Sequence, residues 1–242
     1  MKKERLDIDR VAFIGRTYEE YEKIFGLDYR HLRKARILDC PAGAASFAAE
    51  AGRRGFDVVA CDILYGLSRR ALLSKGEKDI ALINEKLGGV AHLYLWDYYR
   101  DRDGLISKRR EALGRFAADF PRGRAAGRYV AASLPRLPFA DGTFSLVLSC
   151  HFLFLYGDML DIDFHKECLL ELARVSSGDV LIFPLSGLDG DPYPHLGEVL
   201  RFLDVNGVEA GIRRAPFEFQ RDANMMMRLR RKWSSEIKRR GR

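Results

Sequence analysis

Two aspartates end two apolar stretches near the start of the chain, and a loop of small residues follows the first. The stretch from Ile37 to Phe47 reads ILDCPAGAASF, with Asp39 just before the loop. The second aspartate, Asp62, closes the run VVACD and lies 19 residues after Gly43. An acid about 20 residues after a glycine turn is the spacing that places a carboxylate on the hydroxyls of an adenosine ribose. The pattern therefore predicts a cofactor site that contains Asp62.

The loop after Asp39 is unusual for a nucleotide-binding turn. It reads CPAGAA from Cys40 to Ala45, so Gly43 is its only position without a side chain. Small residues such as Ala42 let a backbone pass close to a ligand, whereas Pro41 stiffens the turn and removes one backbone donor. Taken alone, the loop fits either a cofactor turn with unusual residues or an ordinary turn between a strand and a helix.

Strands and helices alternate along most of the chain. A helix should follow Thr17, which can form a capping box with Glu20. The spacing of apolar residues predicts strands over 36–40, 56–61, 129–132, 144–152 and 179–185, and helices over 44–54, 68–87 with an interruption near Gly76, 159–175 and 194–206. The last part, 209–229, reads as two strands joined by a turn around 221–224.

This alternation predicts an α/β fold, a Rossmann-like, doubly wound and mostly parallel seven-stranded sheet with an antiparallel C-terminal hairpin. We expect a single domain over 1–242. Within it, 1–35 would form an N-terminal helical lid and 88–127 a helical insertion between the second and third strand–helix units. The segment 228–242 would form a basic C-terminal tail.

Ligands of a doubly wound sheet bind at the carboxyl ends of its strands, which singles out three further residues. His151 ends the fourth strand, where an imidazole could act as a general base or orient a nucleophile. The alternative is a histidine that only packs locally. Tyr156 could line a substrate pocket or fill the core. Arg16 precedes the first helix and could hold a carboxylate of cofactor or substrate, or lie on the surface as an ordinary arginine.

Two runs of the sequence are similar to a known superfamily. ILDCPAGAASFAAEAGRRGFDVVACDIL resembles the first motifs of the class I S-adenosylmethionine-dependent methyltransferases, and YVAASLPRLPFADGTFSLVLSCHFLFLY resembles their third and fourth strands in the small-molecule, methyltransferase-11-like branch. With the terminal hairpin, the resemblance covers about 36–185 and 209–229. A group of bacterial proteins in this superfamily shares the GRTYEEY start, the DCPAGA loop and a similar end of the chain.

The resemblance implies an enzyme that uses S-adenosylmethionine, with roles for the residues near the first two strands. Asp39 would lie under the methionine part of the cofactor and order the loop and the ammonium group. The loop from Cys40 onwards would form the glycine turn. Asp62 would hold the ribose, and Ile63 would pack on the adenine.

The resemblance also implies cofactor contacts after the third and fourth strands. Ser133 stands where the family often has an aspartate near the adenine amine, and Leu134 follows it. Ser149, Cys150 and His151 match the end of the fourth strand, beyond which the chain would face the substrate. The loop departs from the family's G-x-G-x-G pattern because Pro41 and Ala45 replace two glycines. A sulfonium cofactor has no pyrophosphate, so its loop need not approach as closely as a dinucleotide loop.

Composition limits the other possibilities. The four cysteines show no CxxC spacing, so we expect neither a metal site nor a disulfide framework. No apolar run approaches the roughly 18 residues of a membrane span, and the two lysines of MKKERLDIDR are followed by no apolar h-region, so we expect a cytoplasmic protein. The net charge is +7, with much of the excess in RLRRKWSSEIKRRGR at the C-terminus.

The sequence leaves three functions open. The favoured one is methyl transfer from S-adenosylmethionine to a small-molecule acceptor; such an in-line displacement needs little acid–base help. A non-catalytic module that binds RNA or another polyanion through the basic tail is the second. The third is a nicotinamide-dependent oxidoreductase, which the single glycine of the loop disfavours. The acceptor and the oligomeric state are not indicated by the sequence.

Overall fold

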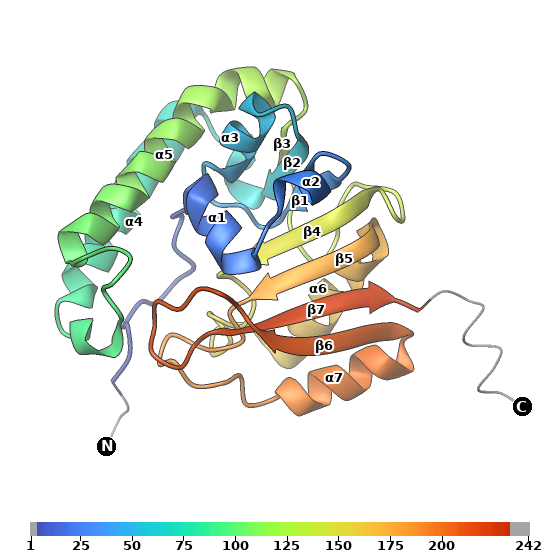
Figure 1. The fold of residues 1–242 in the computed structure, drawn as a ribbon. Coiled ribbons are helices and arrows are strands. Elements are labelled where there is room, and N and C mark those ends of the chain that lie inside the picture. The colour runs from blue at the N-terminus through green and yellow to red at the C-terminus, as the bar shows by residue number, and fades with distance from the viewer. Residues whose placement is uncertain (1–3, 233–242) are drawn as a thin grey trace, which may run out of the picture.

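A seven-stranded sheet forms the centre of the molecule, with the strand order β3-β2-β1-β4-β5-β7-β6. The computed structural model describes residues 4–232. Neighbouring strands from β3 to β5 in this order are parallel, and β7 is antiparallel to both β5 and β6. The strands are β1 Arg36–Asp39, β2 Asp57–Asp62, β3 Tyr129–Ala131, β4 Phe144–Cys150, β5 Ser176–Phe183, β6 Val208–Arg214 and β7 Met225–Arg231. The predicted fold class is therefore confirmed, including the antiparallel C-terminal hairpin (Figure 1).

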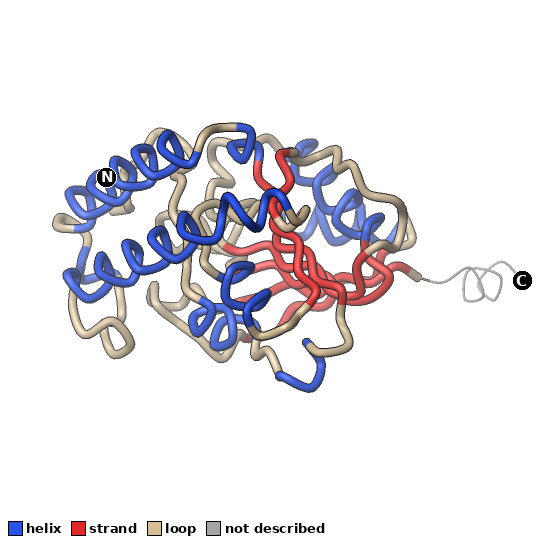
Figure 2. The backbone as a smooth tube through the Cα atoms, turned by 90° about the horizontal axis from the view of Figure 1, so that it is seen from above, coloured by secondary structure: helices blue, strands red, loops and turns tan. Residues whose placement is uncertain are grey.

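Helices cover both faces of this sheet (Figure 2). They are α1 Tyr18–Phe25, α2 Tyr29–Leu32, α3 Phe47–Arg53, α4 Arg69–Leu87, α5 Arg102–Ala125, α6 Ile162–Val175 and α7 Leu196–Val205, with the short 3-10 turns η1 Ile63–Gly66 and η2 Ala91–Leu93. Successive strand residues point to opposite faces. Ile37 of β1 thus packs in the core with α1, α3, α4 and α5, while Leu38 packs in the core with α6 and α7.

The first helix follows its sequence signals closely. Thr17 accepts a hydrogen bond from the Glu20 amide, and the Glu20 carboxylate accepts one from the Thr17 amide, which confirms the capping box. Tyr18, Tyr21 and Phe25 are all buried on one face of α1. This face sets α1 against α3, where the rings of Tyr21 and Phe47 stack with centroids 4.6 Å apart.

Several helices differ from the prediction. The helix α6 begins at Ile162 and not at residue 159, and α7 is shorter at both ends than the predicted 194–206. Two further differences have a packing reason. The helix α4 runs without interruption through Gly76, because the glycine lets α5 pack closely: a Cβ at Gly76 would lie 2.6 Å from Cδ1 of Leu113. The helix α3 begins at Phe47 and not at residue 44, since the residues before it are held by another part of the chain. No helix between residues 4 and 232 combines the length and apolar character that crossing a bilayer requires.

Candidate functional site

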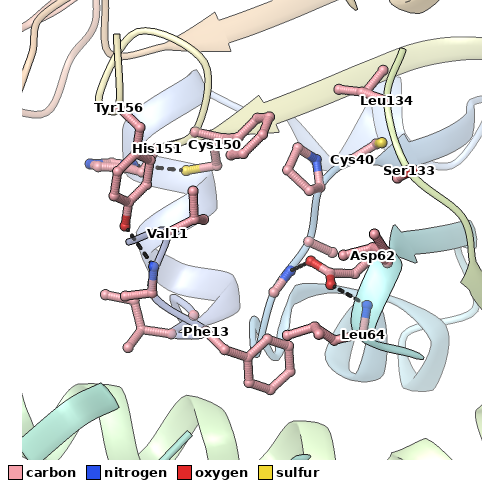
Figure 3. Close-up of a pocket in the computed structure, with 18 of the residues that line it drawn as sticks. Val11, Phe13, Cys40, Asp62, Leu64, Ser133, Leu134, Cys150, His151 and Tyr156 are labelled. Carbon is pink, nitrogen blue, oxygen red and sulfur yellow. Dashed lines mark hydrogen bonds between the residues drawn. The ribbon is translucent and has the colours of Figure 1, made fainter. Parts of the chain in front are cut away.

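A cavity of about 410 Å³ lies at the carboxyl ends of β1, β2 and β4. Asp62, Ser133 and Leu134 lie on one side of it, and His151 and Tyr156 on the other (Figure 3). The predicted site residues that line it are Arg16, Cys40, Pro41, Ala42, Gly43, Asp62, Ile63, Ser133, Leu134, Cys150, His151 and Tyr156. The sequence pattern thus found 12 of the 24 residues that line the cavity, and the predicted Asp39 and Ser149 are not among them.

Every backbone N–H group in the loop after β1 donates a hydrogen bond to another group of the protein. The amides of Cys40, Ala42 and Ala45 donate to the carbonyls of Leu148, Cys61 and Ala42. The Gly43 amide donates to Asp62, and those of Ala44 and Ser46 donate to carbonyls of Ile14 and Arg16. Proline has no amide hydrogen. The loop therefore presents no free N–H group of residues 40–46 to a pyrophosphate, which such turns normally bind through backbone amides.

Gly43, the glycine of the loop, allows two segments of the chain to pass close to each other. Gly43 has φ +54°, and a Cβ there would lie 2.6 Å from the carbonyl oxygen of Ile14. On the crossing segment, a Cβ at Gly15 would lie 2.0 Å from the backbone of Ala44. Both glycines are thus required where the N-terminal segment crosses the loop. This crossing was not predicted, although the paired small residues around Gly15 and Gly43 are its signal.

Asp62 is held rigidly at the end of β2. Its Oδ2 accepts from the Gly43 amide at 3.0 Å and its Oδ1 from the Leu64 amide at 2.9 Å. Burial raises the pKa of this carboxyl, which two backbone donors partly offset. Each carboxylate oxygen has a further lone pair for a ligand. Ile63 beside it is 67% exposed, so an apolar surface lies next to the carboxylate.

Asp39, which the resemblance places under the methionine part of the cofactor, does not itself line the cavity. Its side chain is completely buried, and both carboxyl oxygens accept from the Tyr21 hydroxyl at 3.0 and 3.1 Å. Burial raises the pKa of Asp39 well above its usual value. Tyr21, which the sequence pattern did not indicate, lines the cavity in its place. Asp39 therefore acts on the cavity from behind its wall, through its hydrogen bond with Tyr21 and through its charge, which in addition to burial raises the pKa of Cys150.

Ser149 is the second predicted residue that the structure places elsewhere. It is 1% exposed, and its Oγ has no hydrogen-bond partner among the described residues. Side chains alternate along a strand, so the neighbours Ser149 and Cys150 of β4 cannot face the same side. Cys150 lines the cavity, and Ser149 points to the opposite face of the sheet.

His151 follows β4 with a left-handed backbone, φ +55°. Its amide donates to the Phe183 carbonyl, and its Nδ1 lies 3.1 Å from Sγ of Cys150. Burial, reinforced by the charges of Arg16 and Arg109, lowers the pKa of His151 well below 6.5. Burial also raises the pKa of Cys150 to about 12. The pair is therefore a thiol and a neutral imidazole at physiological pH, not a thiolate–imidazolium pair.

Arg16 and Tyr156 differ in how they are held. The Tyr156 hydroxyl accepts from the Ala12 amide at 3.1 Å, which fixes its ring against the N-terminal segment. No hydrogen bond or ion pair holds the Arg16 side chain among residues 4–232, and its Nε is buried. An unpaired guanidinium in a partly buried place can bind an anionic group of a ligand. Lys75 also lines the cavity, but it forms an ion pair with Asp79 at 2.8 Å.

The basic C-terminal segment falls partly outside the described residues. Within β7, Arg228 and Arg230 both bind Asp179, at 2.8 and 2.6 Å, and Arg231 binds Asp141 at 3.3 Å. Residues 233–242 of the predicted tail lie beyond the part of the chain that the structure describes. The part that is described therefore uses its arginines in internal ion pairs.

Comparison with known proteins gives one similar sequence and several similar folds. No family model matches the chain. The uncharacterized protein MJ0045 of Methanocaldococcus jannaschii is 29% identical over 227 residues, which cover 93% of this chain and 99% of that protein. Among solved structures, the PH0226 protein of Pyrococcus horikoshii is 12% identical, with a TM-score of 0.46 over 88% of this chain and 90% of its own.

Two further solved structures are methyltransferases with a bound cofactor or its product. The 1,6-didemethyltoxoflavin-N1-methyltransferase of Burkholderia thailandensis, with S-adenosylhomocysteine, is 16% identical; the match covers 85% of this chain and 75% of that one, with a TM-score of 0.44. The magnesium protoporphyrin IX methyltransferase of Synechocystis is 13% identical over 83% and 72%, with a TM-score of 0.43. At these scores the likenesses add nothing to the strand order, which already shows the Rossmann-like fold implied by the resemblance to class I methyltransferases.

Proposed function

We propose that this protein is an S-adenosylmethionine-dependent methyltransferase that acts on a small-molecule acceptor. The observation that carries the proposal is the end of the cavity at β2, where the Asp62 carboxylate lies beside the exposed side chain of Ile63. A ribose needs hydroxyl acceptors and an adenine needs an apolar surface, and these two residues supply both. The loop nearby has no free amide for a pyrophosphate, which argues against a nicotinamide dinucleotide.

The remaining parts of the cofactor would match residues elsewhere in the cavity. The unpaired Arg16 would hold the methionine carboxylate, and Tyr21, fixed by Asp39, would line the same region. Ser133 and Leu134 would contact the adenine from the loop after β3. When bound, the cofactor supplies an electrophilic methyl group on a sulfonium. The chain's own contribution is to place the acceptor in line with that group and to exclude water.

The proposal also includes the predicted lid over the site and the predicted cellular location. The segment 1–35 and the region 88–127 would cover the site, and the enzyme would act in the cytoplasm. The hydrogen bond from the Ala44 amide to the Ile14 carbonyl and the close crossing at Gly15 support a covering role for the first of these segments. For RNA binding through the tail, the described part of the segment supplies no supporting feature, because its arginines are paired.

Isothermal titration calorimetry with S-adenosylhomocysteine and with NAD tests the proposal. S-adenosylhomocysteine should bind, and Asp62→Asn should weaken it by about 1–3 kcal/mol through the loss of charge-assisted hydrogen bonds. Asp57→Asn is the matched control, because Asp57 starts the same strand and pairs on the surface with Arg36 at 3.6 Å. Tight binding of NAD without a response to S-adenosylhomocysteine would refute the proposed cofactor.

A further inference from the structure

The strand β6 is the last strand of the sheet, and only one of its edges is paired. It bonds to β7 on one side, and within residues 4–232 no strand pairs with its other side (Figure 1). The pairing with β7 runs from Val208 to Arg214 without a register shift. Glu209 and the residues from Gly211 to Arg214 are exposed. The strand therefore offers a continuous, accessible edge of seven residues.

Alternate residues of β6 direct their backbone groups away from β7. At one end of the pairing, the Lys232 amide donates to the Gly207 carbonyl. At the other end, the Ala215 amide donates to the Asn224 carbonyl. Because only every second residue of an antiparallel strand bonds to a given neighbour, the odd-numbered residues of β6 bond to β7. The N–H and C=O groups of the even-numbered residues point to the open edge, namely those of Val208, Ala210, Ile212 and Arg214.

The open edge of β6 has few of the features that keep sheet edges from pairing. Such edges are usually short, bulged, interrupted by proline, covered by another element or charged. The strand has no proline and no bulge within its seven residues. The helix α7 packs on the face of β6 that carries Val208, but Ile212 on the same face is 39% exposed. Of these features only charge applies to β6, so its charges decide which strand can pair with it.

The charges of β6 are complementary to those of a second β6 that runs in the opposite direction. Glu209 lies two residues before Gly211, and Arg213 lies two residues after it. When two copies pair with Gly211 opposite Gly211, each Glu209 faces an Arg213 of the other copy, which stabilises an antiparallel pair. Neither side chain has an ion pair among the described residues, because Arg230, the neighbour of Glu209 on β7, binds Asp179.

The same register also uses the outward-pointing backbone groups. With Gly211 on the axis, Ala210 faces Ile212 and Val208 faces Arg214, and residues that face each other in this way exchange two hydrogen bonds. A shift of one residue would oppose outward-pointing residues to residues that bond to β7. A shift of two residues would place Gly211 opposite Glu209 or Arg213 and leave both charges without a partner. Backbone and charge therefore select one register, in which the whole strand is paired.

We propose that β6 pairs with β6 of a second copy of this chain, which gives a symmetric dimer with one continuous sheet. Most symmetric dimers use such a self-complementary contact around a two-fold axis. The axis would pass beside Gly211, where a Cβ would meet no atom within 4 Å. The central cavity lies at β1, β2 and β4, and β5 and β7 separate these strands from β6. The dimer is therefore independent of the proposed function.

Sedimentation equilibrium of the full chain tests the dimer. One copy has a mass of 27.6 kDa, and we expect twice this mass at about 100 μM chain, since specific interfaces have dissociation constants of micromolar or below. Arg213→Glu places two carboxylates opposite each other at both ends of the contact, so the dissociation constant should rise by at least about tenfold. The matched control is Arg214→Glu, which makes the same change of charge opposite Val208 and should alter the constant by less than about threefold.

An exchange of charges separates this contact from any other dimer surface. Glu209→Arg alone should weaken the dimer as Arg213→Glu does. The double variant Glu209→Arg/Arg213→Glu again places opposite charges across the axis. Its dissociation constant should return to within about threefold of the wild-type value, because the two changes are coupled across the contact.

A cysteine at the axis tests the register directly. Residues that face each other without hydrogen bonds in an antiparallel pair have Cα atoms about 4.5 Å apart, which suits a disulfide. Treatment of Gly211→Cys with oxidised glutathione should therefore join the two copies, while the glutathione is reduced to its thiol. Ile212→Cys is the control, because residue 212 faces residue 210 of the other copy. The four native cysteines are buried.

The outcomes distinguish this dimer from its alternatives. A monomer at about 100 μM overturns the proposal, whether the edge stays free or binds an extended peptide of another protein. A dimer that Arg213→Glu weakens no more than Arg214→Glu uses another surface and also overturns it. Should Arg213→Glu fail to fold, as judged by thermal unfolding, equal cross-linking of Gly211→Cys and Ile212→Cys decides against the proposal. Failure of S-adenosylhomocysteine to bind removes only the proposed function.

Discussion

The two sides of the central cavity differ in how completely the protein uses its own polar groups. On the side of β1 and β2, every loop amide from Cys40 to Ser46 has a partner within the protein, and both oxygens of Asp62 accept backbone hydrogen bonds. On the side of β4, Arg16 and Nε2 of His151 have none among the described residues. The polar groups of the first side are thus held by the protein itself, whereas the second side has polar groups that can bind a ligand.

Two arginines show the same contrast between polar groups that are paired within the protein and polar groups that are not. Arg109 is 3% exposed and binds Glu20, the Tyr99 hydroxyl and the Gly15 carbonyl, so its charge is fully compensated. Arg16 lies close enough to influence the pKa of Glu20 and His151, but its side chain has no hydrogen bond within the described part of the chain. One arginine therefore holds the fold, and the other is available for function. The following predictions test this division, beginning with the largest effect.

Removing Arg109 should cost the most stability. Arg109→Met leaves Glu20 buried without its partner, and the loss of one member of a buried ion pair costs about 3–5 kcal/mol. Urea unfolding followed by circular dichroism measures the change. The control is Arg110→Met, whose side chain pairs with Glu77 at the surface and should matter by less than about 1 kcal/mol. Equal losses for the two variants would contradict the buried role of Arg109.

Lowering the pH should weaken the same ion pair between Glu20 and Arg109. Burial by itself would raise the pKa of Glu20, but the charge of Arg109, the hydrogen bonds from Arg109 and Tyr99 and the charge of Arg16 together outweigh it and lower this pKa from 4.5 to about 2. A carboxyl with a lowered pKa in the folded state stabilises it above pH 4.5, and this contribution, about 3 kcal/mol, is lost as the pH falls towards 2. Unfolding free energies measured between pH 5 and pH 2 should show this loss. In Glu20→Gln the dependence over that range should be weaker, and an unchanged slope would exclude Glu20 as its source.

The crossing of the loop and the N-terminal segment should be sensitive to one methyl group. Gly43→Ala places a Cβ at a left-handed φ and 2.6 Å from the Ile14 carbonyl oxygen, so we expect a loss of about 1–3 kcal/mol. Gly114→Ala is the matched control, because it lies within α5 with open space around it and should stabilise the helix by about 0.5–1 kcal/mol. Denaturant unfolding compares the two, and a Gly43→Ala protein as stable as the wild type would disprove the tight crossing.

Removing Arg16 should have the smallest effect on stability and a clear effect on binding. Arg16→Met breaks no hydrogen bond or ion pair among the described residues and removes only a weaker charge interaction with Glu20, so the unfolding free energy should change by less than about 1 kcal/mol. The affinity for S-adenosylhomocysteine should fall by about 1–3 kcal/mol, because a charge-assisted hydrogen bond to its carboxylate is lost. Calorimetry and urea unfolding on the same preparation give both numbers. A large loss of stability would show that Arg16 is held within the protein, as Arg109 is.

The sequence predicted the fold well because its signals are local. The apolar runs, the capping box at Thr17 and Glu20, and the turn before β7 all depend on neighbouring residues. The spacing of Asp62 from Gly43 also proved structural, since the two are joined by a hydrogen bond. Such features are visible in a short window of sequence.

The parts that could not be predicted depend on contacts between distant residues. Asp39 and Ser149 lie outside the cavity because of the strand face on which each side chain lies. The sequence of a single strand does not show which of its faces points into the cavity. The pair of Glu20 and Arg109 joins residues 89 positions apart.

The way the N-terminal segment is attached has a consequence for when the protein can first bind a ligand during its synthesis. Residues 12–16 bond to Asp79, Tyr156 and the loop before α3, so the wall they form needs partners from three later parts of the chain. These residues leave the ribosome before the partners that they bind, and the wall is complete only when Tyr156 has emerged. A nascent chain that ends before that point has the loop and Asp62 but an open cavity. Ligand binding therefore becomes possible only after Tyr156 has emerged, well after the loop and Asp62 have been made.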